Sequence, residues 1–313
     1  MPLGLRRGTV TGVVERVDGL VRLEVDGIPC IAYPWLTGEV EEGDDVLVNE
    51  QARLLELGSG GFDILYANLT RGLGLPPEDG AHVMALPYTP GQFAALHVEE
   101  HGLLDESLDG MPVVLCTVHS QVAPVCAGLR GTRVAYVQVA GGALPVSFSD
   151  TVRTLRERGY LDVTCAVAPC IDGDAQFVTA AGALAWTKAE LAEAVVCSVG
   201  PGIVGTGSRL GHGALALADV ANVATALDGR PVLAVRTSDR DERERHRGVS
   251  HHVRAVLDLA RGPVVIPDYV DGHGWREATR ELPLSSMGRG PGDDPGFFRA
   301  AYAAGVAARK LIA

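Results

Sequence analysis

Two short segments in the second half of the sequence combine residue types that bind anions and transfer protons. Residues 200–208 read Gly-Pro-Gly-Ile-Val-Gly-Thr-Gly-Ser, and residues 245–252 read Arg-His-Arg-Gly-Val-Ser-His-His. Each segment follows an apolar run typical of a buried strand and precedes a helical pattern. Because the carboxyl ends of parallel strands meet at one edge of a sheet, we expect both segments to border one site there.

The glycine-rich segment predicts a cradle of backbone amides for an anion. Successive N–H groups in such a turn can form a nest around an anionic oxygen, and nearby hydroxyl and guanidinium groups add donors. The alternative is a turn whose glycines only let a strand and a helix pack closely. The predicted ligand-binding residues of this segment are Gly202, Gly205, Thr206, Gly207, Ser208 and Arg209.

The same glycines match the spacing of a dinucleotide fingerprint, Gly200-x-Gly202-x-x-Gly205. Two features argue against a nicotinamide or flavin cofactor. Pro201 has no amide hydrogen to donate, and the next helical pattern starts only near Gly213. We therefore favour a small anionic ligand over a dinucleotide.

The second segment predicts an acid–base site. Ser250 is a suitable N-cap, so His251 and His252 would occupy the first turn of a helix. There the positive end of the helix dipole opposes protonation and lowers the pKa of an imidazole, and Arg245 and Arg247 act in the same direction. We predict that the two arginines orient an anion and that His251 or His252 transfers a proton.

A divalent metal, as in a metal-dependent hydrolase, stays open as an alternative, with His246, His251 and His252 as candidate ligands. Two arginines beside a dication are unfavourable unless an anion or a carboxylate lies between them. The nearby acids alternate with arginines, which is typical of a solvated face of paired charges, so a surface loop of ion pairs is a second alternative. These acids are Asp239, Asp241, Glu242 and Glu244, and the arginines among them are Arg240 and Arg243.

Two residues from other parts of the chain are candidates for the same site. His119 follows the first strand of the expected sheet and would face the pocket as a further catalytic imidazole. Ser120 beside it lacks the Gly-x-Ser-x-Gly surroundings of a hydrolase nucleophile. Arg289, which lies between two glycines, would swing over the site as a lid residue and bind the ligand.

The first 75 residues predict a small all-β module. Runs rich in β-branched residues at 10–17, 20–25 and 28–33 are separated by Asp-Gly pairs, a strong hairpin signal, and a further turn and strand follow at 41–48. This pattern favours an SH3-like or OB-like barrel. Because the segment carries many more carboxylates than arginines, we expect a module for interaction or dimerisation.

Residues 76–313 predict a mainly parallel α/β domain. After Pro112 the order strand, loop, helix repeats at roughly 30-residue spacing, which is typical of βαβ units in a Rossmann-like sheet with helices on both faces. Residues 76–111 would connect the two parts, and residues 275–313 would form a glycine-rich tail ending in a helix. The expected strands are residues 113–118, 134–139, 163–167, 195–199, 232–235 and 264–266. The expected helix N-caps are Ser149, Thr187 and Ser250.

Composition argues against several partners and compartments. The net charge of -12 at pH 7 disfavours binding to nucleic acid or to an anionic membrane surface. No apolar stretch is long enough to cross a bilayer, and the N-terminus lacks a secretory pattern. The six cysteines include no Cys-x-x-Cys pair and are typical of reduced thiols, so we expect a cytoplasmic protein.

Taken together, these motifs resemble those of a bacterial family known as domain of unknown function 3866. The residues that carry the resemblance are Gly200-Pro-Gly202, Gly205-Thr-Gly207, Arg245-His-Arg-Gly248, Ser250-His-His252, Met287-Gly-Arg-Gly290, Asp294-Pro295 and Phe297-Phe298. The likeness extends over essentially the whole length. It implies a bacterial cytoplasmic protein with an N-terminal β portion, and it implies no substrate, cofactor or catalytic role.

From the residues themselves we expect an enzyme that binds a small phosphorylated or carboxylated metabolite and uses histidine acid–base chemistry. The alternative is a noncatalytic metabolite sensor or scaffold. In that case the β module would contact a partner or a second copy of the chain, as in a homodimer.

Overall fold

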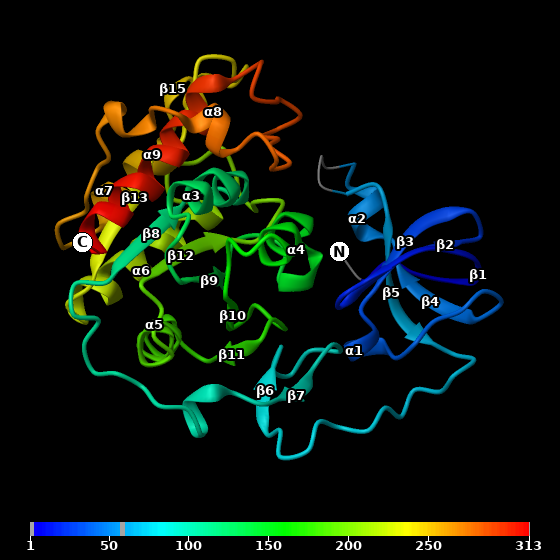
Figure 1. Ribbon diagram of the computed structural model, residues 1–313. Helices are drawn as coiled ribbons and strands as arrows, with labels where there is room; N and C mark the ends of the chain where they lie inside the picture. The colour runs from blue at the N-terminus through cyan, green and yellow to red at the C-terminus, as the bar shows by residue number, and fades with distance from the viewer. Residues whose placement is uncertain (1–2, 57–59, 313) are drawn as a thin grey trace. The chain divides into compact units, whose positions relative to one another are not determined.

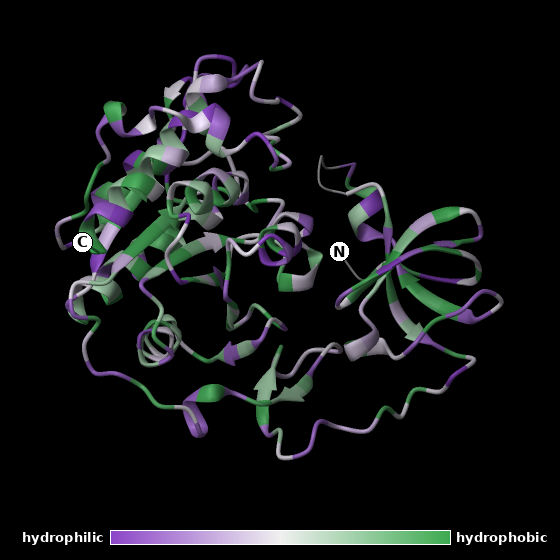
Figure 2. Cartoon of the chain, viewed as in Figure 1, coloured by the Kyte–Doolittle hydropathy of each residue, from purple (hydrophilic) through white to green (hydrophobic). Residues whose placement is uncertain are grey.

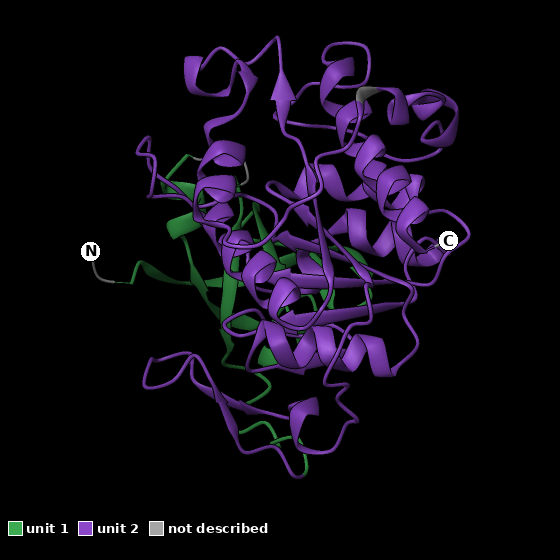
Figure 3. Cartoon of the chain, turned by 90° about the vertical axis from the view of Figure 1, so that its left-hand side faces the viewer, with its two compact units in different colours: residues 1–79 green, residues 80–313 purple. Residues whose placement is uncertain are grey.

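The computed structural model describes residues 3–56 and 60–312. The chain divides into two compact units, residues 1–79 and residues 80–313, which we call the barrel unit and the α/β unit (Figure 3). Each has its own hydrophobic core.

The five strands of the barrel unit form a closed barrel in the order β1-β2-β3-β5-β4, with β4 pairing back onto β1 (Figure 1). The turn between β2 and β3 consists of Asp26 and Gly27, which both have positive φ, as a tight two-residue hairpin turn requires. This barrel confirms the predicted all-β module. Its elements are β1 (Leu5–Val17), β2 (Leu20–Val25), β3 (Ile28–Ala32), α1 (Pro34–Thr37), β4 (Asp45–Asn49), α2 (Gln51–Leu54) and β5 (Asp63–Asn68).

A buried carboxylate is neutralised within the barrel unit. Asp63, the first residue of β5, is fully buried and accepts hydrogen bonds from Arg6 at 2.9 Å and from Arg53 at 2.8 Å. A buried carboxylate is costly unless it is paired and hydrogen-bonded. The two arginines therefore fasten β1 and α2 to β5.

Six parallel strands form the central sheet of the α/β unit in the order β11-β10-β9-β12-β8-β13 (Figure 1). The central strands are mostly apolar because both faces of the sheet are covered, as the green colour of β8 and β12 in Figure 2 shows. The sheet confirms the predicted parallel α/β architecture. Its strands are β8 (Pro112–Cys116), β9 (Val134–Val139), β10 (Val163–Val167), β11 (Ala175–Phe177), β12 (Ala194–Val199) and β13 (Arg230–Ala234).

Helices pack on both faces of this sheet. Successive residues of β8 point to opposite sides, so that Val114 joins one hydrophobic core and Val113 joins the other. The first core includes residues of α3 (Val122–Gly128), α4 (Asp150–Glu157) and α9 (Pro295–Ile312). The second includes residues of α5 (Ala180–Ala189), α6 (Ala216–Ala226) and α7 (His251–Leu259).

The prediction of a strand at residues 264–266 is wrong. These residues contribute a single backbone pair, between Val265 and Val232 of β13. Pro263 and Pro267 flank the segment, and because proline has no amide hydrogen, neither can extend the ladder. The short strand β11 takes the sixth place in the sheet instead.

The prediction of a helix start at Thr187 is also wrong. Helix α5 begins earlier, after Thr179, whose side chain accepts a hydrogen bond from the amide of Gly182. Thr187 lies within α5, and its hydroxyl donates to the carbonyl of Leu184 at 2.9 Å. A threonine in a helix can bond back to the preceding turn in this way, so its presence does not by itself mark a helix start.

Short elements complete the α/β unit. Among the described residues, no helix has both the length and the apolar character needed to cross a membrane. The remaining elements are β6 (Val83–Ala85), β7 (Phe93–Ala95), η1 (Val98–Glu100), η2 (His119–Gln121), η3 (Val146–Phe148), η4 (Gly213–Leu215), β14 (Thr237–Ser238), η5 (Glu244–His246), β15 (Gly248–Val249), η6 (Tyr269–Gly272) and α8 (Trp275–Ala278).

Candidate functional site

The segments that follow β12 and β13 meet at the carboxyl edge of the sheet. The chain after β12 forms a narrow hairpin in which Gly205 pairs with His212. The ring of His212 then stacks on the ring of His252, in α7, with 4.1 Å between the ring centroids. The two segments singled out in the sequence therefore lie side by side.

The start of α7 is fixed by a predicted cap. Ser250 Oγ accepts a hydrogen bond from the amide of His252 at 3.2 Å. Just before it, Gly248 has a φ of +64° within β15, which pairs with β14. This turn and cap place His251 and His252 in the first turn of α7, as the sequence predicts.

Four imidazoles form a compact group, which we call the imidazole cluster: His212, His246, His251 and His252. The ring of His251 lies 4.5 Å from that of His252, 4.8 Å from that of His246 and 5.1 Å from that of His212, measured between centroids. His251 is half-buried and the other three are buried. Three members are predicted from the sequence, and the hairpin after β12 adds His212.

The ring nitrogens of the cluster differ in their partners. Arg236 donates a hydrogen bond to Nδ1 of His252 at 3.1 Å, and Nδ1 of His246 lies 2.8 Å from Oγ of Ser250. By contrast, both ring nitrogens of His212 and Nε2 of His251 are buried and lack a hydrogen bond of normal geometry within the described part of the chain. The backbone of Arg209 nevertheless contacts the His212 ring and opposes the fall in its pKa. Because unsatisfied buried polar atoms are costly and rare, these nitrogens mark a place suited to a ligand.

Burial and nearby positive charge keep the imidazoles neutral. Burial lowers the pKa of His246 to about 3 and that of His252 to about 2, and the charge of Arg236 acts in the same direction. Burial also lowers the pKa of His212 and of His251. A neutral imidazole has a lone pair that can accept a proton or bind a metal ion. The pKa values of the imidazoles are thus lowered, as the sequence predicts, and burial is a larger cause than the nearby positive charges.

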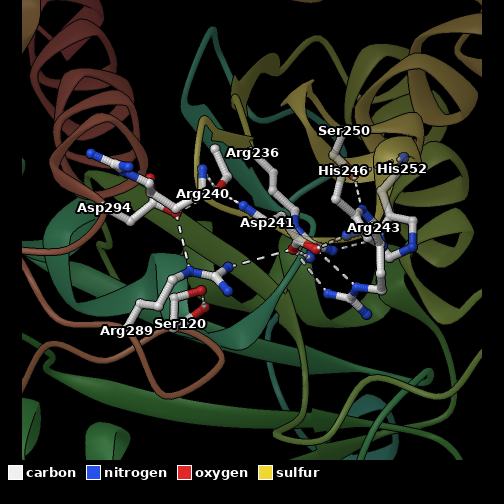
Figure 4. Close-up of polar contacts among 12 residues, drawn as sticks. Ser120, Arg236, Arg240, Asp241, Arg243, His246, Ser250, His252, Arg289 and Asp294 are labelled. Atoms are coloured by element: carbon white, nitrogen blue, oxygen red, sulfur yellow. Dashed lines mark hydrogen bonds and ion pairs between the residues drawn. The ribbon is translucent and has the colours of Figure 1, made fainter.

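A buried carboxylate gathers three arginines beside the cluster (Figure 4). Oδ2 of Asp241 lies 2.9 Å from Arg243, 3.4 Å from Arg289 and 3.7 Å from Arg236. Burial opposes the ionisation of Asp241, but the hydrogen bonds from Arg243 outweigh it and hold the pKa of the carboxyl well below its usual range. The interpretation of Asp241 as part of a solvated face is therefore wrong, since this residue is only 3% exposed.

Arg289 extends this charged group towards a pocket. Its Nε lies 3.4 Å from Oδ2 of Asp294, which also accepts a hydrogen bond from Ser238. A pocket of about 550 Å³ is lined by Arg240, Gly288, Arg289, Gly292 and Asp293. A second pocket, of about 560 Å³, is lined by Arg130, Arg158, Tyr160 and Glu281, none of which belongs to the imidazole cluster.

The glycine-rich segment is exposed and partly bonded to itself. The amide of Thr206 donates to the carbonyl of Gly211 at 2.6 Å, and the amide of Ser208 donates to Oγ1 of Thr206 at 3.2 Å. Two of the amides predicted to hold an anion are thus already occupied. The segment nevertheless lies close to the arginine–histidine segment, because a Cβ atom added to Gly207 would be 3.8 Å from Nη1 of Arg245.

The flanking glycines allow two loops to touch. A Cβ atom on Gly200 would lie 2.0 Å from the carbonyl oxygen of Ala143, and one on Gly213 would lie 2.2 Å from that of Gly141. The loops after β9 and β12 therefore pack backbone against backbone, which requires glycine. Helix α6 begins only at Ala216, unlike the helix that follows a dinucleotide-binding loop directly.

His119 lies at the same edge of the sheet but does not join the imidazole cluster. Its Nδ1 lies 3.3 Å from the carbonyl oxygen of Val199, and its Nε2 lies 2.6 Å from Oγ of Ser149. Both ring nitrogens are thus engaged, and burial lowers the pKa of His119 to about 4. These contacts connect the loop after β8 to the end of β12 and to the N-cap of α4.

The other predicted ligand-binding residues lie at the surface. Gly202, Arg209, Arg245 and Arg247 are exposed. Arg209 forms an ion pair with Asp258 of α7 at 2.6 Å. The structure thus brings Arg289 to the buried charges and leaves Arg245 and Arg247 on the solvent side.

Three central residues of this site are not among those predicted from the sequence to form it: His212, Arg236 and Asp241. Arg236 had a usable signal, because it is a charged residue two positions after the end of a buried strand, where ligand-binding residues are common. His212 and Asp241 had none, since their burial depends on distant parts of the chain.

Comparison with known proteins gives a family without an assigned activity. No curated protein matches this chain. A family model described as "Protein of unknown function (DUF3866)" matches residues 29–275. The matched range includes the whole imidazole cluster together with Arg236 and Asp241, whereas Arg289 and Asp294 lie beyond it. Because the match covers well over half of the sequence, the chain belongs to the DUF3866 family of proteins of unknown function.

Proposed function

We propose that the α/β unit is an enzyme that binds a small phosphorylated or carboxylated metabolite at the carboxyl edge of its sheet, with the imidazole cluster as its reactive centre. One observation supports this most strongly: among the described residues, buried imidazole nitrogens without hydrogen-bond partners lie beside the buried Arg236 and the half-buried Arg289. Arginine is well suited to hold a carboxylate or a phosphate, and imidazole is the commonest proton-transfer group of enzymes.

The arginines bind the anion in this proposal. Arg240 and Arg289 line the pocket, and Arg289 faces the carboxylates of Asp241 and Asp294 at 3.4 Å each. A ligand anion can take the place of one of these longer contacts without leaving the guanidinium unpaired. The proposed contacts on the solvent side are Gly202, Gly205, Thr206, Gly207, Ser208, Arg209, Arg245 and Arg247.

His251 and His252 are the proposed reactive residues. Nδ1 of His252 accepts the hydrogen bond from Arg236, so the neutral ring carries its hydrogen on Nε2 and can donate it. Nε2 of His251 lacks such a partner and can accept a proton, either directly or through a group that the rings hold. His119 is left out of the proposed mechanism because both of its nitrogens are engaged.

A ligand screen followed by one pair of variants tests the proposal. Thermal unfolding of the full chain is measured with inorganic phosphate, phosphorylated metabolites and carboxylates, since a ligand of the native state raises the melting temperature. For the best ligand, Arg289→Met should weaken binding by about 10-fold or more, because a charge-assisted contact is lost. The matched control is Arg254→Met, an exposed arginine of α7, which should bind normally. Equal affinity of both variants would contradict the proposed anion site.

The second candidate is a noncatalytic sensor or scaffold. The separate core of the barrel unit favours it, because a module that folds around its own core can serve a partner or a second copy of the chain. A His251→Gln, His252→Gln double variant separates the two candidates. Both would still bind the anion through arginine, but only for an enzyme would turnover of the bound metabolite be lost.

Three finer features belong to the same proposal. We propose that the barrel is SH3-like or OB-like, which its closed five-stranded order supports. We also propose that the sheet is Rossmann-like in the broad sense of parallel strands with helices on both faces, which the two cores flanking it support. A dinucleotide is not among the proposed ligands, and the net charge of -12 keeps nucleic acid from being a proposed partner. A cytoplasmic location is supported by the six unpaired cysteines, all of them buried.

A further inference from the structure

We infer that His212, His251 and His252 form a binding site for a transition-metal dication, with zinc as the reference ion. The inference rests on the proposed function for its location, and it adds the ion that would act on the anion there. Within the described residues, one potential ligand atom from each of these three histidines lies within 4.8 Å of the other two.

The unpartnered nitrogens are the independent support. Within the described residues, Nε2 of His251 is buried without a hydrogen-bond partner. His212 is 7% exposed, and its ring nitrogens have no hydrogen bond of normal geometry apart from a contact with the backbone of Arg209. Two imidazoles of one group with unsatisfied nitrogens are unusual in a packed core, where polar atoms are almost always paired. A shared metal ion would satisfy Nε2 of His251 and one nitrogen of His212 at once.

Ligand type and number point to a catalytic class of metal site. Imidazole nitrogens suit zinc, copper, nickel and iron, whereas magnesium and calcium prefer oxygen. Three protein ligands leave a fourth tetrahedral position open, as in catalytic zinc sites. In tetrahedral zinc the ligand nitrogens are about 3.4 Å apart, given Zn–N bonds of about 2.1 Å. The rings therefore need to close in modestly from a separation of up to 4.8 Å.

The sequence favours a different set of candidate ligands, with His246 in place of His212. In the structure Nδ1 of His246 is engaged with Ser250, and the three closest ligand atoms belong to the other rings. His246 therefore supports the site from the side, as a neighbour of His251 and His252.

Arg236 would have to release His252 when the ion binds. A neutral imidazole that binds a metal through Nε2 carries its hydrogen on Nδ1, and such a nitrogen cannot accept a hydrogen bond from Arg236. Arg236 has another partner at hand, since its Nη2 is 3.7 Å from Asp241. Turning towards Asp241 would also place a carboxylate between the guanidinium and the dication.

The charges around the site predict what fills the fourth position. Arg236, Arg243 and Arg289 are balanced by only two carboxylates of the group, Asp241 and Asp294. A dication adds further positive charge, so an anionic ligand restores the balance. We therefore expect a phosphate or carboxylate oxygen of the substrate to take the fourth position, where the ion would polarise it as a Lewis acid.

Zinc binding to the full chain tests the inference without any assay of activity. The protein is treated with a chelator, dialysed against zinc chloride, and analysed for bound zinc; cobalt(II) then replaces zinc so that its visible spectrum reports a tetrahedral site. We expect one ion per chain. His212→Gln and His251→Gln should each weaken binding more than about 100-fold, because even changes to groups that only support ligands cost about 10- to 100-fold.

Three controls keep the result interpretable. His101→Gln removes an exposed histidine and should bind zinc normally, and His246→Gln, which changes a supporting residue, should lose about 10- to 100-fold, less than either ligand variant. Unfolding curves without metal show whether His212→Gln and His251→Gln still fold. A wild-type chain that binds neither zinc nor cobalt would overturn the inference, as would full binding by both ligand variants.

The same measurements separate this inference from the proposed function. If no metal binds while Arg289→Met still weakens anion binding, the metal site is contradicted and the anion site is supported. If zinc binds to His212 and His251 but Arg289→Met does not change the affinity for the anion, the anion site is contradicted and the metal site is supported.

Discussion

Arg236 donates a hydrogen bond to Nδ1 of His252 across 3.1 Å, and neither residue is more than 5% exposed. The contact joins the segment after β13 to the first turn of α7. It also sets the hydrogen of the neutral His252 ring on Nε2. One buried cation thus determines both the position and the donor pattern of an imidazole in the candidate site.

Arg236→Met should therefore destabilise the α/β unit. We expect a loss of about 2 kcal/mol in the free energy of unfolding, because a buried hydrogen bond from a charged donor disappears and Nδ1 of His252 loses its partner. Urea unfolding measures this. Arg247→Met, at an exposed position of the same segment, should change the stability by less than about 0.5 kcal/mol. Equal stability of the two variants would show that the contact is energetically neutral.

His119 should make stability depend on pH. Its pKa is lowered from 6.5 to about 4 in the folded protein, so the unfolded chain binds a proton first as the pH falls. The contribution of the neutral ring is therefore complete above pH 6.5 and is lost progressively towards pH 4. We predict that His119→Gln is less stable than the wild type at pH 7.5 and that the difference shrinks on acidification. Urea unfolding at several pH values checks this, and a difference that stays constant or grows as the pH falls contradicts it.

Gly142→Ala should disturb the loops at the carboxyl edge of the sheet. A Cβ atom there would lie 2.1 Å from the carbonyl oxygen of Gly200, so the loops after β9 and β12 must move apart. We expect a loss of about 1–3 kcal/mol in stability, as for other overpacked positions, together with weaker ligand binding. Gly296→Ala in α9 is the control, because its Cβ atom meets nothing within 4 Å. Alanine there should be neutral or stabilise the helix by up to about 1 kcal/mol, and a calorimetric comparison of the two variants decides.

Asp63→Asn should destabilise the barrel unit selectively. It leaves Arg6 and Arg53 without the buried carboxylate that both contact, which we expect to cost about 3 kcal/mol. Asp45→Asn breaks the exposed pair with Arg7 and should leave the stability nearly unchanged, because such surface pairs contribute little. Hydrogen exchange followed by mass spectrometry locates the effect. Faster hydrogen exchange in β8 to β13 of the Asp63→Asn variant, with the barrel strands unchanged, would contradict the prediction.

The sequence predicts the parts of this structure that depend on local signals. The Asp26-Gly27 turn needs two residues with positive φ, and Asp-Gly is suited to it wherever it occurs. The cap at Ser250 is equally local, so the sequence alone assigns two imidazoles to the first turn of α7. The parallel strands can be recognised in the sequence as continuous apolar runs, because both faces of each strand are buried.

What the sequence leaves open depends on residues far apart in the chain. Asp241 lies in a run of alternating charges, yet it is buried, and one of its partners is Arg289, 48 positions later. His212 enters the cluster only because its hairpin folds back at Gly205. Thr179 and Thr187 are a case in which the sequence offers two possible helix starts. Both precede helix-forming residues, and only packing selects Thr179 as the N-cap of α5. Local patterns cannot distinguish such cases.

The stacking of His212 on His252 joins two points that lie on either side of β13 in the chain. His212 lies just before η4 and α6, and His252 lies in α7, so the connection between the two rings comprises α6, β13 and the loops around them. A ligand bound by both rings would have to dissociate before that connection could unfold. The unfolding rate would therefore depend on the fraction of molecules that hold the ligand. The lifetime of the protein against proteases would then follow the supply of its ligand.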